Sequence, residues 1–233
     1  MTFPFRAALF DLDGTLIDSA GGIAEAVNRT LLVLGHAAQD EATVRGWIGD
    51  GARLLLRRAL DHAGASLPAG EGFEAAYALL MRHYGESLPR QAVAYPGAAE
   101  AMRALQADGV RVALCTNKPA RFIAPLLDAL DWHGCFEAIV GGDTLPERKP
   151  DARPLLHIAE GFDLVPGHCL MVGDSRTDAE AARAAAMPLA LVDYGYRRDF
   201  DLDAAGAWRV MGDLRELLHG GAASAPTKRP AGR

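Results

Sequence analysis

Short apolar runs alternate with longer amphipathic segments along most of the chain, and this alternation predicts its fold. The apolar runs predict five strands, at residues 6–10, 110–115, 136–140, 169–172 and 189–192. The segments between and after them predict helices at residues 98–108, 119–130, 152–161, 176–186 and 213–218. Strands that alternate with helices in this way form parallel sheets with helices on both faces. We therefore predict an α/β fold built on a doubly wound parallel sheet.

The segment from residue 18 to residue 90 has a different pattern, in which only helices are predicted. One helical face is marked by apolar residues spaced four, four and three apart, namely Ile23, Val27, Leu31 and Leu34. Two further helices are predicted before residue 90. The chain is thus expected to have an α/β core, made of residues 1–17 and 91–218, with a helical domain of residues 18–90 inserted after the first strand. Residues 219–233 are rich in Gly, Ala, Pro and basic residues, and we predict that they are disordered.

Polar clusters follow four of the predicted strands. They are Asp11 and Asp13 after the first strand, Thr116 to Lys118 after the second, Arg148 to Pro150 beyond the third, and Asp174 to Asp178 after the fourth. The carboxyl ends of parallel strands meet at one edge of the sheet, where open α/β folds bind their ligands. We expect these four clusters to converge there.

Asp11 and Asp13 place two carboxylates where a buried strand ends. By itself, the Asp-Leu-Asp-Gly sequence is more typical of a strand that ends in an acidic turn, and only the other clusters of the chain favour a site. Two neighbouring carboxylates repel unless one is protonated or a cation lies between them. Oxygen ligands favour a hard divalent cation, with Mg²⁺ first among them. Asp174 can add a third carboxylate, and Asp178 can orient a metal-bound water or another ligand.

The remaining strand-end residues complete a set suited to phosphoryl transfer. Thr116 and the backbone around it offer neutral donors to phosphoryl oxygens. Lys149 supplies a positive charge that can keep the first carboxylate ionised and also neutralise a phosphoryl group. Carboxylates, a divalent cation, an ammonium group and neutral donors together are the parts that phosphoryl transfer requires. The chain has no Gly-x-x-x-x-Gly-Lys-Ser/Thr loop, which argues against a P-loop enzyme.

Composition narrows the possible partners and location. The 233 residues carry a net charge of −6, which argues against a nucleic-acid partner. No apolar run approaches the roughly 18–20 residues that a membrane span needs, and the N-terminus lacks the features of a secretory signal. We therefore expect a cytoplasmic enzyme that does not contact a membrane. Cys115, Cys135 and Cys169 match no zinc spacing and are expected to be buried and inert.

Together the four clusters resemble the motifs of the haloacid dehalogenase superfamily of aspartyl phosphatases, over residues 5–218. The resemblance implies that Asp11 attacks phosphorus to form an aspartyl phosphate, and that Asp13 protonates the leaving alcohol and then activates water. It implies that Thr116 and Asn117 bind the phosphoryl group and that Lys149 steadies both nucleophile and phosphate. It also implies that Mg²⁺ is bound by Asp11, the backbone carbonyl of Asp13 and Asp174, with Asp178 in support.

The resemblance also bears on the substrate, a small phosphorylated metabolite. Dehalogenases of the superfamily lack an acid at the position of Asp13, so the chain is more similar to the phosphatases. The helical segment resembles the small cap of the superfamily, which closes over the substrate. Among the phosphatases the chain is most similar to the phosphoglycolate phosphatases, through residues 47–53, 95–97 and 193–196. Arg53 and the loop at Gly49 are then expected to bind the substrate, with Arg53 reaching the carboxylate of phosphoglycolate.

Alternatives remain at this point. Gly49 and Gly51 could serve only to cap and hinge helices, and Arg53 could be a solvated side chain. The runner-up substrates are sugar phosphates, including N-acetylmuramic acid 6-phosphate, and pyrophosphate, and phosphomutases share the same motifs. A scaffold that keeps the fold without catalysis is a further alternative, although such a protein is expected to have lost Asp11 or Asp174. Either a monomer or a homodimer is compatible with the sequence.

Overall fold

The computed structural model describes residues 3–65 and 70–219, so the predicted disordered tail lies almost entirely outside the described residues. The central element is a six-stranded parallel sheet in the order β5-β4-β1-β6-β7-β8. Its strands are β1 (Ala7–Phe10), β4 (Arg111–Cys115), β5 (Ala138–Val140), β6 (Cys169–Gly173), β7 (Leu189–Val192) and β8 (Arg209–Met211). The predicted fold class is confirmed, and β8 is a strand that the apolar pattern did not predict, because only Met211 of its three residues is buried.

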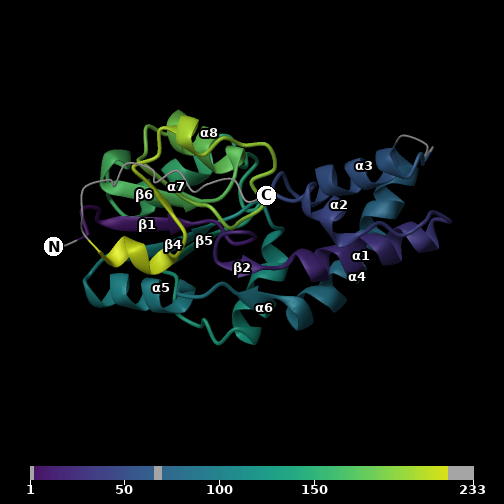
Figure 1. Cartoon of the computed structure of the whole chain (residues 1–233), viewed down its shortest axis with the longest axis horizontal. Coiled ribbons are helices and arrows are strands. Elements are labelled where there is room, and N and C mark those ends of the chain that lie inside the picture. The colour runs from purple at the N-terminus through teal and green to yellow at the C-terminus, as the bar shows by residue number, and fades with distance from the viewer. Residues whose placement is uncertain (1–2, 66–69, 220–233) are drawn as a thin grey trace, which may run out of the picture.

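Both faces of the sheet are buried, which explains the continuous apolar runs of its strands. Side chains of β1 alternate between two hydrophobic clusters, with Ala7 and Leu9 in one and Ala8 and Phe10 in the other. Helices α7 (Arg153–Gly161) and α8 (Arg176–Ala184) cover one face, and α5 (Ala98–Ala107) and η4 (Leu214–Leu218) cover the opposite face (Figure 1). The other elements outside the sheet and the helical segment are η1 (Ala120–Phe122), α6 (Ile123–Ala129), η2 (Pro166–His168) and η3 (Asp203–Ala205).

Four helices lie in the chain between β1 and β4 before α5, and Figure 1 shows them beside the sheet. They are α1 (Ala20–Val33), α2 (Glu41–Arg45), α3 (Ala52–His62) and α4 (Glu71–Gln91), which we call the helical segment. Helix α1 packs mainly on α4, and its predicted apolar face is buried at Ile23, Val27 and Leu31, while Leu34 ends the helix half-buried. That this segment acts as a separate cap domain stays a prediction.

The chain leaves and re-enters the sheet through a two-stranded antiparallel ribbon that the sequence did not predict. Strand β2 (Ile17–Asp18) pairs with β3 (Val93–Ala94), with Ile17 opposite Ala94. The two strands flank the helical segment in sequence, so their pairing holds its two connections to the sheet side by side. No helix in the described part of the chain has both the length and the apolar character needed to cross a membrane.

Candidate active site

The strand-end clusters meet at one edge of the sheet, as the parallel arrangement requires. Strand β1 lies between β4 and β6, so the residues that follow these three strands are neighbours in space. Asp11, Thr116 and Asp174 come from these three strand ends, and all three side chains are buried. Lys149, from the loop before α7, is also buried and joins them.

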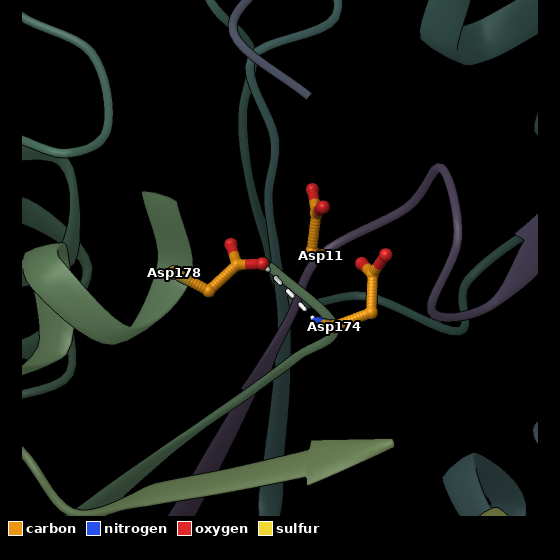
Figure 2. Close-up of side chains that lie close together, drawn as sticks. All are labelled: Asp11, Asp174 and Asp178. Atoms are coloured by element: carbon orange, nitrogen blue, oxygen red, sulfur yellow. Dashed lines mark hydrogen bonds between the residues drawn. The ribbon is translucent and has the colours of Figure 1, made fainter. Parts of the chain in front are cut away.

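Three carboxylates form the centre of the site (Figure 2). One carboxylate oxygen from each of Asp11, Asp174 and Asp178 lies within 4.8 Å of the other two. Asp11 and Asp174 follow strands, whereas Asp178 projects from α8. Burial, with neighbouring carboxylates in the same direction, raises the pKa of Asp174 well above its usual range. Burial also raises the pKa of Asp11 to about 6, although Lys149 acts in the opposite direction.

Lys149 is the cation that faces this acidic trio. Its Nζ lies 3.0 Å from Oδ1 of Asp11 and 2.7 Å from Oδ1 of Asp178. Burial opposes the charged form of the lysine, but the two carboxylates outweigh it and raise the pKa of Lys149. One ammonium group against three carboxylates leaves a formal excess of two negative charges in a buried space. Such an excess is costly unless a cation offsets it.

Asp178 differs from the other two carboxylates because its oxygens already have several donors. Oδ1 accepts from Nζ of Lys149, and Oδ2 accepts from the backbone N–H of Asp174 at 3.2 Å and of Ser175 at 3.1 Å. The Ser175 hydroxyl also donates to Oδ2, at 2.6 Å, and these two residues form a capping box at the start of α8. Asp178 therefore holds the strand-end loop and Lys149 in place.

Asp11 and Asp174 keep free acceptor capacity, which fits a divalent cation. Asp174 accepts one hydrogen bond at each oxygen, from the Thr15 hydroxyl at 2.8 Å and from the Tyr196 backbone N–H at 2.5 Å. Oδ1 of Asp11 is buried and accepts no hydrogen bond within the described residues, although Lys149 lies in ionic contact. Oxygen donors with spare lone pairs and an excess of two negative charges match the preferences of Mg²⁺.

Asp13 lies beside the trio but its side chain faces another cation. Nζ of Lys118 lies 2.7 and 2.8 Å from the two carboxylate oxygens of Asp13, and the Ser19 hydroxyl donates to Oδ1 at 2.5 Å. No role for Lys118 was expected from the sequence. Its position directly after Thr116 and Asn117 could have indicated a role, since a charged residue at the end of a buried strand needs a partner.

Asn117 connects the sheet to the helical segment. Its amide Nδ2 donates to the carbonyl of Gly49 at 3.1 Å and to that of Lys149 at 2.8 Å. A small cavity of about 30 Å³ lies between the two parts. The side chains and glycines that line it are Asp11, Asp13, Ile23, Ile48, Gly49, Gly51, Ala52, Leu55, Tyr84, Thr116, Asn117 and Lys118. The structure thus brings Gly49, Thr116 and Asn117 together with the two aspartates of the first motif.

The structure does not bring Arg53 to this cavity. Its guanidinium group is exposed and makes two hydrogen bonds of 2.8 Å to Glu74. It also lies over the ring of Tyr77, 4.3 Å from the ring centroid. The first turn of α3 turns this side chain towards α4, so the expected contact with a substrate carboxylate is absent from this arrangement.

Gly195 is a further residue beside the site that the apolar and polar pattern did not identify by itself. An added Cβ there would lie 2.3 Å from Cβ of Asp174 and 2.5 Å from the carbonyl oxygen of Gly14. The next residue, Tyr196, is the one that donates its N–H to Asp174. The segment after β7 can therefore support Asp174 only because residue 195 has no side chain.

A hydrolase is the class that this fold and site define, and the family comparison agrees. The family model for haloacid dehalogenase-like hydrolases matches residues 5–186, and the chain belongs to this family. Its curated relatives include the phosphoglycolate phosphatase of Pseudomonas putida, 45% identical over 92% of this chain and 79% of that protein. Phosphoglycolate phosphatase 1 of Pseudomonas aeruginosa is 42% identical over 91% of this chain and 78% of that protein.

Solved structures give the same answer. A crystal structure described as a predicted phosphoglycolate phosphatase from Haemophilus somnus superposes with a TM-score of 0.88 at 33% identity. The superposition covers 94% of this chain and 98% of the Haemophilus somnus chain. The chain is therefore an enzyme, of the phosphoric monoester hydrolase class within its family.

Proposed function

We propose that this protein is a Mg²⁺-dependent phosphatase that hydrolyses 2-phosphoglycolate to glycolate and phosphate through a phosphorylated aspartate. The observation that carries the proposal is the buried trio of Asp11, Asp174 and Asp178 with Lys149 between two of its members. The names of the curated relatives support the choice of substrate.

Asp11, Asp174 and the backbone carbonyl of Asp13 would hold Mg²⁺, and Asp178 would support them from α8. When bound, the ion supplies positive charge that offsets the carboxylates and the phosphoryl oxygens. The spare acceptor capacity of Asp11 and Asp174 supports this assignment.

The side chains of the site divide the chemistry between them. A carboxylate oxygen of Asp11 forms a bond to phosphorus while the bond from phosphorus to the ester oxygen breaks. Asp13 gives its proton to that oxygen, and then takes a proton from the water that attacks the aspartyl phosphate. Thr116 and Asn117 offer a hydroxyl group and amide groups to the phosphoryl oxygens. Lys149 keeps Asp11 ionised and adds positive charge near the phosphate.

The size of the cavity favours a small ester over the alternative substrates. The centres of water molecules can reach a volume of about 30 Å³ in it, so the space beside Asp11 and Asp13 is small. Phosphoglycolate has only two carbon atoms and fits a small space more readily than a sugar phosphate does. The sugar phosphates, pyrophosphate and phosphomutase reactions are therefore outcomes of the test and not parts of the proposal.

A comparison of phosphate esters with and without metal tests this proposal. In Mg²⁺ we expect kcat/KM for 2-phosphoglycolate to exceed that for sugar phosphates, N-acetylmuramic acid 6-phosphate and pyrophosphate by about tenfold or more. Removal of the metal with EDTA is expected to lower the rate about 100-fold or more, because a major source of charge stabilisation is lost. Phosphate release is the measurement, and added Mg²⁺ is expected to restore it.

Several results would contradict the proposal. A higher kcat/KM for a sugar phosphate than for 2-phosphoglycolate would show that the proposed substrate is wrong. Full activity in EDTA would show that the reaction does not need a metal ion. A reaction that a sugar bisphosphate activates, and that returns an isomeric phosphate ester without releasing phosphate, would assign a mutase.

The support that Gly195 gives to Asp174 leads to a second prediction. In Gly195→Ala the new methyl group collides with Asp174, so we expect the Mg²⁺ concentration for half-maximal activity to rise about 10- to 100-fold. Gly161→Ala is the matched control, because an added Cβ on that α7 residue meets open space. An unchanged Mg²⁺ requirement in Gly195→Ala would show that Asp174 does not bind the metal in the way we propose.

A further inference from the structure

We propose that Lys118 binds a second anionic group of the substrate, a carboxylate placed one carbon atom beyond the phosphate ester. This inference rests on the proposed phosphatase function, and it assigns the specificity for phosphorylated carboxylates to a residue of the sheet edge. Lys118 follows β4 and directly adjoins the residues that would bind the phosphoryl group.

Lys118 is the one positively charged side chain among the described residues that line the cavity. The side chain is fully buried, with 0% exposure. Its ammonium group lies between both oxygens of Asp13 and the aromatic ring of Tyr84, whose centroid is 5.1 Å away. The Tyr84 hydroxyl lies 3.5 Å from Nζ. A buried ammonium group held at the wall of a cavity is a strong attractor for an anion that enters it.

The position of Lys118 follows from the chemistry of the ester. Asp13 must reach the ester oxygen to protonate it, so the atoms bonded to that oxygen lie beside Asp13. In phosphoglycolate a single methylene group separates this oxygen from the carboxylate. The ammonium group that contacts both oxygens of Asp13 is therefore within reach of the substrate carboxylate.

Lys118 also resolves an electrostatic problem of this substrate. A carboxylate that enters beside Asp13 would meet another carboxylate, and two such groups repel unless a cation lies between them. Lys118 can bridge the two. An ester with an uncharged tail gains nothing from this arrangement, so the effect discriminates between substrates.

The opposite wall of the cavity is compatible with the same anion. Gly51 is the N-cap residue before α3 and has no side chain to bond the N–H groups of the first turn, and both Gly51 and Ala52 line the cavity. The free N–H groups at the start of a helix carry partial positive charge. The other side chains of the helical segment that line the cavity are Ile23, Ile48, Leu55 and Tyr84, which add no charge at neutral pH. Arg53, which the sequence suggested for this role, lies outside the cavity and donates two hydrogen bonds to Glu74.

The test compares two esters of nearly equal size in Mg²⁺, 2-phosphoglycolate and 2-hydroxyethyl phosphate, in which an alcohol replaces the carboxylate. We expect the wild-type protein to prefer the carboxylate. In Lys118→Met the ratio of the two kcat/KM values should fall about 10- to 100-fold, as expected for the loss of a charged hydrogen bond. Lys118→Gln keeps a donor for Asp13 without the charge, and we expect the same fall.

The ratio separates substrate recognition from a merely structural role. If Lys118 only positions Asp13, both esters lose rate equally and the ratio stays at its wild-type value, which would overturn the proposal. Arg57→Met is the control, since this exposed arginine lies on α3 against Phe73 and outside the cavity, and its ratio should not change. A fall of the ratio in Arg53→Met in place of the Lys118 variants would also overturn the proposal.

The same measurements distinguish this inference from the function on which it rests. If the wild-type protein hydrolyses neither ester in Mg²⁺, the proposed phosphatase function fails. If it hydrolyses both esters with equal kcat/KM, the phosphatase function stands and the role of Lys118 is wrong.

Discussion

Replacement of Asp11 by Asn is expected to abolish turnover while leaving the fold intact. An amide is a poor nucleophile and a weaker metal ligand than a carboxylate, so kcat should fall by about 10⁴-fold or more. The folded protein should tolerate the change, because burial already disfavours the charge of Asp11 and raises its pKa to about 6. Lys149 keeps its 2.7 Å contact with Asp178 in the variant.

Steady-state phosphate release and urea denaturation in EDTA check this prediction together. We expect an unfolding free energy equal to or above that of the wild type, with activity lost. Such a pair of results would place Asp11 among residues that favour function at the expense of stability. Retention of a substantial part of the wild-type rate would exclude the route through an aspartyl phosphate.

Replacement of Lys149 by Met should have the largest effect on stability. The change removes the ammonium group that contacts Asp11 and Asp178, and among the described residues no other ammonium group pairs with the trio. Breaking a buried ion pair by removing one member destabilises a protein by about 3–5 kcal/mol. We expect a loss of this size in the unfolding free energy in EDTA, together with loss of activity, and a partial recovery in Mg²⁺.

The pH dependence of this variant provides a second measurement. Burial raises the pKa values of Asp11 and Asp174 in the folded state, so the folded protein binds more protons than the unfolded chain in this range. Stability then falls as the pH rises. Without the opposing effect of Lys149, the variant should be clearly more stable in EDTA at pH 5 than at pH 8.

Arg153→Met is the matched control for the loss of Lys149. Arg153 of α7 pairs with Glu160 at the surface, where the two side chains are 42% and 60% exposed, and such pairs contribute little to stability. Its unfolding free energy should remain near the wild-type value. An equal loss of stability in both variants would show that the buried trio does not depend on Lys149.

Much of the fold was predictable because the apolar pattern of each strand reflects burial on both faces of a sheet. The strand at residues 7–10 illustrates this, since its alternate side chains enter two separate clusters and every one of them is buried. The two-residue strands β2 and β3 left no such pattern. They pair because the folded chain brings the two connections of the helical segment side by side, although 74 residues separate Ile17 and Asp18 from Val93 and Ala94.

The candidate site was predictable where residues follow strands, and much less so elsewhere. Asp11, Thr116 and Asp174 had to converge, because parallel neighbouring strands end at one edge. Arg53 shows the limit of this reasoning. Its position beside a glycine loop suggested a ligand, but helix α3 turns it to Glu74, which is 21 residues away in sequence.

The sequence by itself determined which chemical groups this protein has and the order in which strands present them. Tertiary structure alone decided which charges meet. The pairing of Lys118 with Asp13 joins residues 105 positions apart, and the support of Asp174 by the segment at Gly195 depends on a close approach of backbones. The physical reason is that apolar periodicity is a local property of the chain, whereas the distance between two buried charges is set by how all the elements pack.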